Sequence, residues 1–304
     1  MSEVFKIFVI SLIILFGCIY GGMLLLLGIP EVEADVATTS VTVGNAVPSV
    51  SNVVLNGGSD ITLTENTATT VECTATLTDN NGGSDITSAN AVIFRSGVGS
   101  SCTADDNNCY QVSCVLGDVS GNDRNATCTA QIWFHADPTD SGTYASENWD
   151  CEVTAQDSQN ATGSATTTTP VELNTLVALD VTPSISYGTL APGQTLDCSV
   201  LTIATTTGNT AIDANISGTQ MCTDYPTCAG DTIATSSQHY ATSSVVYGSG
   251  YALSDTPTLL EFTTGKPTTH PSNQAQNIYW GIQIPSGQPT GDYTGENTFT
   301  VTQD

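Results

Sequence analysis

Two distant segments of this sequence each place a cysteine within an alternating apolar and polar pattern. Residues 71–77 read Val-Glu-Cys-Thr-Ala-Thr-Leu, and residues 149–155 read Trp-Asp-Cys-Glu-Val-Thr-Ala. Such alternation is typical of a strand that buries one face. Immunoglobulin-like sandwiches join an early strand to a late strand with a disulfide between their two sheets. The pattern therefore predicts a Cys73–Cys151 bond across an Ig-like β-sandwich.

The start of the chain predicts export. Lys6 precedes an apolar run over residues 7–29, and Val32-Glu33-Ala34 then offers small residues where a signal peptidase reads. We therefore expect residues 1–34 to be a signal peptide and the mature protein, from Asp35, to be extracellular or on the cell surface. The run is also long enough to cross a bilayer, so an uncleaved anchor is the alternative. In that case the membrane contact is made by residues 7–29.

The charge of the mature chain limits its partners. Beyond residue 34 there are 27 acidic and 3 basic residues, a formal net charge of −24. Such a surface repels nucleic acid and anionic lipid, so neither is expected as a partner. A solvated acidic surface is the ordinary interpretation, and a surface that holds divalent cations is the alternative.

The predicted fold class is all-β, with two Ig-like β-sandwich domains in tandem after the signal peptide or anchor. Short β-rich runs alternate with Gly, Asn, Asp and Pro, which is typical of sandwiches. The expected strands are Thr70–Thr78, Ala91–Phe94, Thr129–Phe134, Asp150–Ala155, Leu176–Val181, Leu196–Ala204 and Ile278–Ile284. A last run, Thr298–Thr302, is expected to return as a hairpin with Ile278–Ile284. Composition divides the chain into a linker (35–48), a first domain (49–166), a hinge (167–170) and a second domain (171–304).

The remaining cysteines predict three short disulfides and one odd thiol. Six cysteines in one domain allow 15 connectivities, so sequence context has to choose between them. Cys114 and Cys128 flank a Gly/Asp/Asn turn between two strand patterns, and Cys102 and Cys109 close a small polar loop. A zinc knuckle at that loop is disfavoured, because a second ligand pair is missing and the compartment is oxidising. In the second domain we expect a Cys222–Cys228 bond, which leaves Cys198 either buried and free or bonded between molecules.

Two aspartates follow the paired cysteines at equal spacing. Asp79 lies six residues after Cys73, and Asp157 lies six residues after Cys151. If the cysteines are bonded and both strands run toward the same end, the two aspartates sit in neighbouring loops. Oxygen ligands in loops are what Ca²⁺ takes, so Asp79 and Asp157 are candidate calcium ligands. The alternative is that they cap turns through their own backbones; residues 105–108 are a second, weaker candidate.

Several stretches resemble one group of proteins, namely the uncharacterised exported Ig-like β-sandwich surface proteins of uncultured small bacteria. The resemblance rests on strand-and-turn motifs at residues 57–66, 77–82, 102–110, 186–193 and 278–285. It implies a cell-envelope protein whose partners are envelope or neighbouring surface proteins. It carries over no functional residue.

No catalytic arrangement is evident, so we expect no enzyme. The histidines, His135, His239 and His270, are scattered, and the phosphate-loop and metalloprotease patterns are missing. The main hypothesis is therefore a structural or adhesive surface protein. A filament subunit that donates residues 36–47 as a strand is the first alternative. An exported carbohydrate-binding module or enzyme, with a platform on Trp133, Trp149 or Trp280, is the second. Three N-glycosylation patterns begin at Asn125, Asn160 and Asn215.

Overall fold

A computed structural model describes residues 35–304, and these residues form antiparallel sheets with short 3₁₀ turns and no α-helix. This confirms the all-β prediction. Residues 45–304 make up one compact unit. The signal peptide or anchor expected at residues 1–34 lies outside the described residues. Within the described range, no helix has the length and hydropathy of a membrane span.

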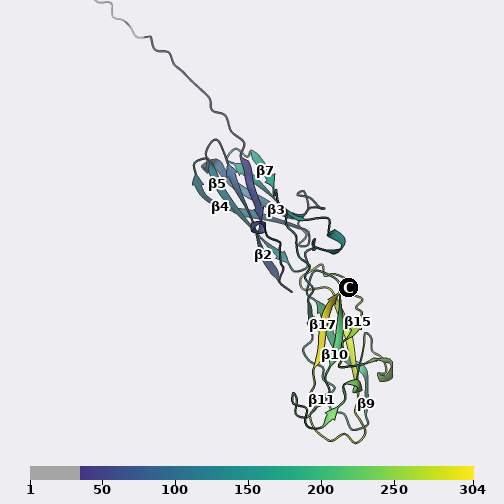
Figure 1. Cartoon of the computed structure of the whole chain (residues 1–304). Coiled ribbons are helices and arrows are strands. Elements are labelled where there is room, and N and C mark those ends of the chain that lie inside the picture. Colours follow the sequence, from purple (N-terminus) through teal and green to yellow (C-terminus); the bar gives the residue numbers. More distant parts are fainter. Residues whose placement is uncertain (1–34) are drawn as a thin grey trace, which may run out of the picture. The chain divides into compact units, whose positions relative to one another are not determined.

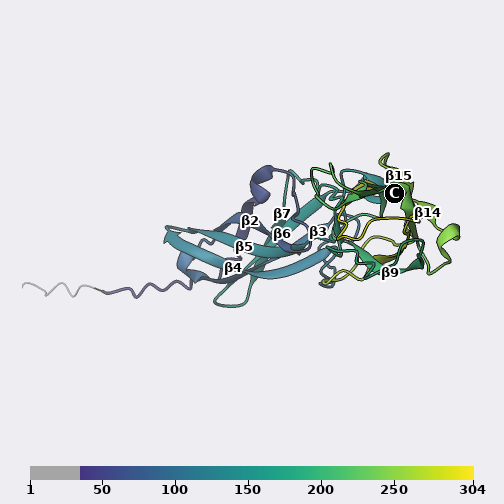
Figure 2. The ribbon, with the colours of Figure 1, turned by 90° about the horizontal axis from the view of Figure 1, so that it is seen from below.

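The first sandwich consists of seven strands in the order β1-β2-β5-β4-β3-β6-β7. Strand β4 passes from one layer to the other, because its first half pairs with β3 and its second half pairs with β5. β4 and β5 lie side by side in both views (Figures 1 and 2). The bounds are β1 (Ser49–Leu55), β2 (Ala68–Thr78), β3 (Ile86–Arg95), β4 (Cys109–Ser120), β5 (Asp123–Trp133), β6 (Trp149–Asp157) and β7 (Thr162–Thr166).

The core of this sandwich follows the alternation seen in the sequence. From Val71 to Leu77 every second side chain of β2 is buried, and β6 alternates in the same way along its whole length. Cys73 and Cys151 are both fully buried and are bonded across the core, with their Cα atoms 6.5 Å apart. The bond therefore fixes β2 against β6, as the two cysteine-bearing patterns predict.

Three further disulfides close short segments. Cys114 and Cys128 are directly opposite each other in the β4–β5 pairing and are bonded. Cys102–Cys109 and Cys222–Cys228 close loops of seven and six residues. The pairs are those expected from the sequence. Cys198 is free and fully buried, and burial raises the pKa of its thiol. Its position favours the buried thiol over an intermolecular bond.

The end of the linker expected at residues 35–48 is attached to the first sandwich. Pro48 is buried and runs beside β7, where a Cβ atom on Gly163 would lie 1.9 Å from the Pro48 carbonyl oxygen. Glycine at position 163 therefore allows the chain to pass. Asn45 donates a hydrogen bond to Asp157 at the end of β6, and Ala46 donates one to Asn81 in the loop after β2.

The second sandwich has its own core around Trp280, Tyr240 and Ile278. Its larger sheet has the order β14-β13-β16-β9-β8. A three-stranded sheet has the order β15-β10-β17, and β11 and β12 form a separate pair. The bounds are β8 (Leu179–Val181), β9 (Thr195–Thr206), β10 (Ile212–Gly218), β11 (Met221–Cys222), β12 (Thr232–Ile233), β13 (Gln238–Ala241), β14 (Tyr251–Ala252), β15 (Thr258–Leu260), β16 (Ala275–Gln283) and β17 (Asn297–Gln303).

The hairpin expected at the C-terminal end is wrong. β16 pairs with β9 and β13, whereas β17 pairs with β10 in the other sheet. The inward faces of the two strands instead meet across the core, where the rings of Trp280 and Phe299 lie edge to face at 6.0 Å. Alternation shows which face of a strand is buried, but it does not identify the neighbouring strand.

The boundary between the first and the second hydrophobic core lies slightly later in the chain than composition suggests. Val171 and Leu173 lie beyond the hinge expected at residues 167–170, yet both are buried in the first core. They are held by isolated bridges to Trp149 and Ile61. Val177 is the first residue that packs on the second core. Pro170 thus interrupts a strand-like segment without ending the domain.

The disulfides are expected to contribute unequally to stability. Removing Cys73–Cys151 by a double Cys→Ala change opens a loop of 78 residues, and removing Cys102–Cys109 opens one of 7. Loop-closure entropy gives losses of about 4.5 and about 2.4 kcal/mol in the free energy of unfolding. Urea unfolding of the two variants measures both losses. Equal losses would show that Cys73–Cys151 is not the main covalent constraint.

Candidate cation site

Three aspartates meet at the end of the first sandwich where β2 and β6 finish. Asp79 follows β2, Asp157 is the last residue of β6, and Asp85 immediately precedes β3. One carboxylate oxygen from each lies within 4.8 Å of one oxygen from each of the others. The structure thus brings together Asp79 and Asp157, as their spacing from the bonded cysteines predicts. It adds Asp85, which the sequence argument missed.

The loop between Asp79 and Asp85 owes its shape to two glycines. A turn runs from Asp79 to Gly82, whose backbone N–H donates to the Asp79 carbonyl at 3.0 Å and whose φ is +117°. Gly83 is buried, and a Cβ atom there would lie 2.6 Å from the carbonyl oxygen of Asp123. The loop therefore folds closely over the β4–β5 turn and carries Asp85 back toward Asp157.

Asp79 and Asp157 each use one carboxylate oxygen to hold their own loop, and Asp85 uses one to hold the loop after β6. Asp79 Oδ1 accepts the Asn81 N–H at 2.7 Å, and Asp157 Oδ1 accepts the N–H groups of Gln159 and Ala161 at 2.9 and 2.8 Å. Asp85 Oδ1 accepts the hydroxyl of Ser158. The turn-capping alternative is therefore realised in the loops of Asp79 and Asp157. It accounts for one oxygen of each of these two side chains.

The segment before β1 also reaches this cluster. Asn45 Nδ2 donates to Asp157 Oδ2 at 2.7 Å, and the Ala46 N–H donates to Asn81 Oδ1 at 2.6 Å. The Asn45 hydrogen bond is the main reason that the pKa of Asp157 lies below its usual range; burial opposes this effect. Asp157 is therefore held as a carboxylate.

The three carboxylates repel one another unless something positive compensates them. Like charges within 4.8 Å repel one another, and the repulsion grows where water is excluded. Asp79 and Asp157 are each only 1% exposed, so solvent screens them poorly. Oxygen groups in this arrangement are candidate ligands for a hard divalent cation.

The weaker candidate at residues 105–108 has a different arrangement. Asp105 Oδ1 accepts the backbone N–H groups of Asn107, Asn108 and Cys109, at 3.0, 2.6 and 3.0 Å. This one oxygen therefore organises the loop that the Cys102–Cys109 bond closes. The turn-capping interpretation fits Asp105, and no metal-binding group of acidic side chains forms there among the described residues.

All three basic residues of the described chain are engaged elsewhere. Arg95 pairs with Glu147 and with Asp137, and Lys266 Nζ lies 2.9 Å from Asp137 Oδ1. Arg124 donates to the carbonyl oxygens of Gly117 and Ile86, at 2.8 and 3.0 Å. Asp137 is buried between its two cations, and burial lowers the pKa of Lys266.

The proposed aromatic platform is not available on two of its three tryptophans. Trp149 and Trp280 are fully buried, and their ring N–H groups donate to the Asp137 carbonyl and to Thr202. Trp133 is partly buried and stacks on His270, with ring centroids 4.3 Å apart. The buried rings of Trp149 and Trp280 have no free face for a sugar, and His270 covers one face of Trp133.

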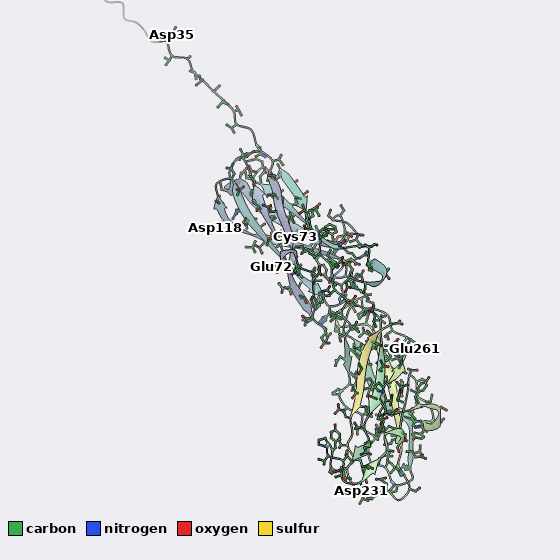
Figure 3. All side chains as sticks on the ribbon, viewed as in Figure 1. Asp35, Glu72, Cys73, Asp118, Asp231 and Glu261 are labelled. Carbon is green, nitrogen blue, oxygen red and sulfur yellow. A yellow bond between two sulfur atoms is a disulfide. The ribbon has the colours of Figure 1, made fainter. Side chains whose placement is uncertain are left out.

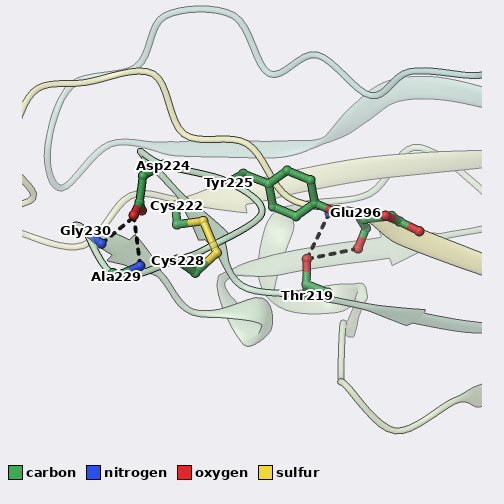
Figure 4. The surroundings of a disulfide bond; sticks show 8 residues. All are labelled: Thr219, Cys222, Asp224, Tyr225, Cys228, Ala229, Gly230 and Glu296. Atoms are coloured by element: carbon green, nitrogen blue, oxygen red, sulfur yellow. Dashed lines mark hydrogen bonds between the residues drawn. A yellow bond between two sulfur atoms is a disulfide. The ribbon is translucent and has the colours of Figure 1, made fainter.

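Apart from Asp137 and Asp213, which are buried, most of the remaining acidic residues lie on the surface. Glu72 and Asp118 on the first sandwich and Asp231 and Glu261 on the second are all exposed (Figure 3). In the Cys222–Cys228 loop, the Asp224 carboxylate accepts the N–H groups of Ala229 and Gly230 (Figure 4). These side chains are solvated or cap turns, in contrast to the buried cluster of Asp79, Asp85 and Asp157.

Comparisons with known proteins define no family. No family model matches this chain, and no curated protein matches it. Among solved structures, the chain is similar to the CsuC–CsuE chaperone–tip adhesion subunit pre-assembly complex from the archaic chaperone–usher Csu pili of Acinetobacter baumannii. The similarity covers 84% of this chain and 99% of that chain, with 10% identity and a TM-score of 0.36. A similarity this distant carries no functional argument. Membership of the exported surface proteins of uncultured small bacteria stays a prediction.

Stability should depend on pH through His135. This side chain is 1% exposed, both ring nitrogens lack partners, and burial followed by the nearby charge of Lys266 lowers its pKa to about 4. The unfolded chain, with a histidine pKa near 6.5, then binds more protons between pH 6.5 and pH 4. The contribution of His135 is therefore complete above about pH 6.5 and is lost as the pH falls.

A pH series of urea unfolding with His135→Gln and the control His239→Gln measures this contribution. Between pH 7 and pH 4, wild type and His239→Gln should lose as much as about 3 kcal/mol more stability than His135→Gln. Parallel profiles for all three proteins would contradict the buried neutral state of His135.

Proposed function

We propose that this protein is an exported, non-enzymatic surface or envelope protein whose Ig-like modules serve a structural or adhesive role. The observation that carries this proposal is the set of four disulfides, three in the first sandwich and one in the second. Disulfides form and persist in oxidising compartments and are rare where thiols are kept reduced. The exposed acidic surface adds to the argument, because it favours a soluble module that avoids anionic lipid.

The positions of the basic, aromatic and histidine side chains support the structural role. Arg95 and Lys266 share the buried Asp137, and the large aromatic side chains fill the cores. The histidines pack against other rings: His135 against Phe134, His239 against Tyr247 and His270 against Trp133. These groups hold the fold together. We therefore propose partners among envelope or neighbouring surface proteins.

A filament subunit is the second candidate, and one observation favours it. Val36, Val41, Val43 and Val47 are 95, 87, 81 and 62% exposed in a segment without strand pairing. An extended, partly apolar segment can add as a strand to the edge of another copy. Size-exclusion chromatography separates the candidates, because a filament subunit gives a ladder of oligomers and an independent surface module gives a discrete species.

Export is tested on the protein from its own cell envelope. We expect N-terminal sequencing to begin at Asp35, because Val32-Glu33-Ala34 is a suitable cleavage site. Non-reducing peptide mapping of the same sample should recover the four disulfides, since an exported chain folds under oxidising conditions. Cytoplasmic protein with reduced Cys73 and Cys151 would contradict the proposal. An intact residue 7–29 segment on surface-exposed protein would instead show that the chain is anchored.

A further inference from the structure

We propose that Asp79, Asp85 and Asp157 bind one Ca²⁺ ion, which fastens together the loops at one end of the first sandwich. This inference is independent of the proposed function, because a surface module can serve its role with or without a bound ion. It rests on the burial of Asp79 and Asp157, on the unpartnered Oδ2 atoms of Asp79 and Asp85, and on the positions of the basic residues.

Two carboxylate oxygens in the cluster are buried without a partner. Asp79 Oδ2 and Asp85 Oδ2 receive no hydrogen bond, although Oδ1 of each accepts one. The Asp79 side chain is 99% buried, as its residual exposure of 1% shows. A buried carboxylate oxygen is strongly destabilising unless it is hydrogen-bonded, paired or bound to a metal. A turn cap in Asp79 and the Ser158 hydroxyl in Asp85 account for the Oδ1 atoms and leave both Oδ2 atoms unexplained.

The protein supplies no cation for these oxygens from its described residues. Arg95 and Lys266 form ion pairs with Asp137. Arg124 donates to the carbonyl oxygens of Gly117 and of Ile86, the residue after Asp85, and forms no ion pair with the three aspartates among the described residues. Asn45 neutralises no charge, although it donates to Asp157. Among the described residues, no ion pair therefore compensates the three clustered carboxylates.

The donor set selects the kind of ion. All three ligands are carboxylates, which suit Ca²⁺ or Mg²⁺ and not the softer metals that prefer nitrogen or sulfur. Ca²⁺ binds oxygens at about 2.3–2.6 Å, so oxygens up to about 5 Å apart can share one ion. Mg²⁺ bonds of about 2.0–2.1 Å require ligands within about 4.1 Å of one another. The three oxygens all lie within 4.8 Å of one another, a spacing that one Ca²⁺ ion can span.

The ion would connect elements that belong to different parts of the fold. Its ligands come from the end of β2, the end of β6 and the turn before β3. Asp157 and Asn81 also hold Asn45 and Ala46, the residues that lead into β1. Bound calcium would therefore order both the loops and the entry of the chain into the sandwich.

The test uses the full chain with its disulfides formed, after removal of metal with EDTA and at constant high ionic strength. We expect calorimetric titration with CaCl₂ to show one saturable site with Kd of roughly 10⁻⁴–10⁻³ M. MgCl₂ should bind at least tenfold more weakly. Failure of the wild-type protein to bind Ca²⁺ in this range would overturn the inference, and so would tighter binding of Mg²⁺.

Matched variants separate a calcium site from capped turns. Asp79→Asn and Asp85→Asn should each weaken Ca²⁺ binding at least tenfold and abolish the calcium-dependent rise in Tm. Asp118→Asn removes the same charge from an exposed position (Figure 3) and should behave as wild type. In EDTA the cluster variants should melt at or above the wild-type temperature, because a repulsive charge has been removed.

The opposite pattern would show that the aspartates are caps only. In that case both cluster variants would melt below wild type in EDTA, and their rise in Tm with Ca²⁺ would equal that of wild type. Asp85→Asn alone suffices if Asp79→Asn does not fold, because Asp85 is only half-buried. The wild-type titration requires no variant at all.

Discussion

The Cys73–Cys151 disulfide is the constraint on which the first sandwich depends. It joins β2 to β6 through the core. Residues at equal distances beyond the two cysteines therefore lie at similar heights in the sandwich. Six residues of extended chain span about 20 Å, and both strands reach the same end of the sandwich after that length. Asp79 and Asp157 meet there because each lies six residues beyond its cysteine. The proximity of Asp79 and Asp157 thus follows from the bonded pair of strands and the equal spacing along them.

The small number of basic residues determines which acidic side chains can form ion pairs. With three basic residues in the described chain, an ion pair is possible at few places. Arg95 and Lys266 are used at the buried Asp137, where an uncompensated charge would be strongly destabilising. Most acidic side chains are exposed and need no partner. Asp79, Asp85 and Asp157 combine burial, proximity and no basic partner, and this combination distinguishes them from the rest of the acidic surface.

The sequence allowed much of the first domain to be predicted and less of the second. Alternation around Cys73 and Cys151 identified β2, β6 and their bond, because burial of one face is a local property of a strand. The partner of β17 could not be predicted in this way, since pairing depends on the whole sheet. Asp85 was missed because it approaches the cluster through the folding of Gly82 and Gly83, and not through a fixed spacing along a strand. Trp149 and Trp280 were open to a surface interpretation because aromatic type alone does not show burial.

The most direct test of this account is a crystal structure of the protein grown in millimolar CaCl₂, with anomalous data collected at a wavelength where calcium scatters. The account predicts one anomalous peak between Asp79, Asp85 and Asp157, at about 2.3–2.6 Å from an oxygen of each. The same crystal should show the Cys73–Cys151 bond across the core. A map with the three aspartates in their loops, no peak between them and solvent or a protein donor on Asp79 Oδ2 would contradict it.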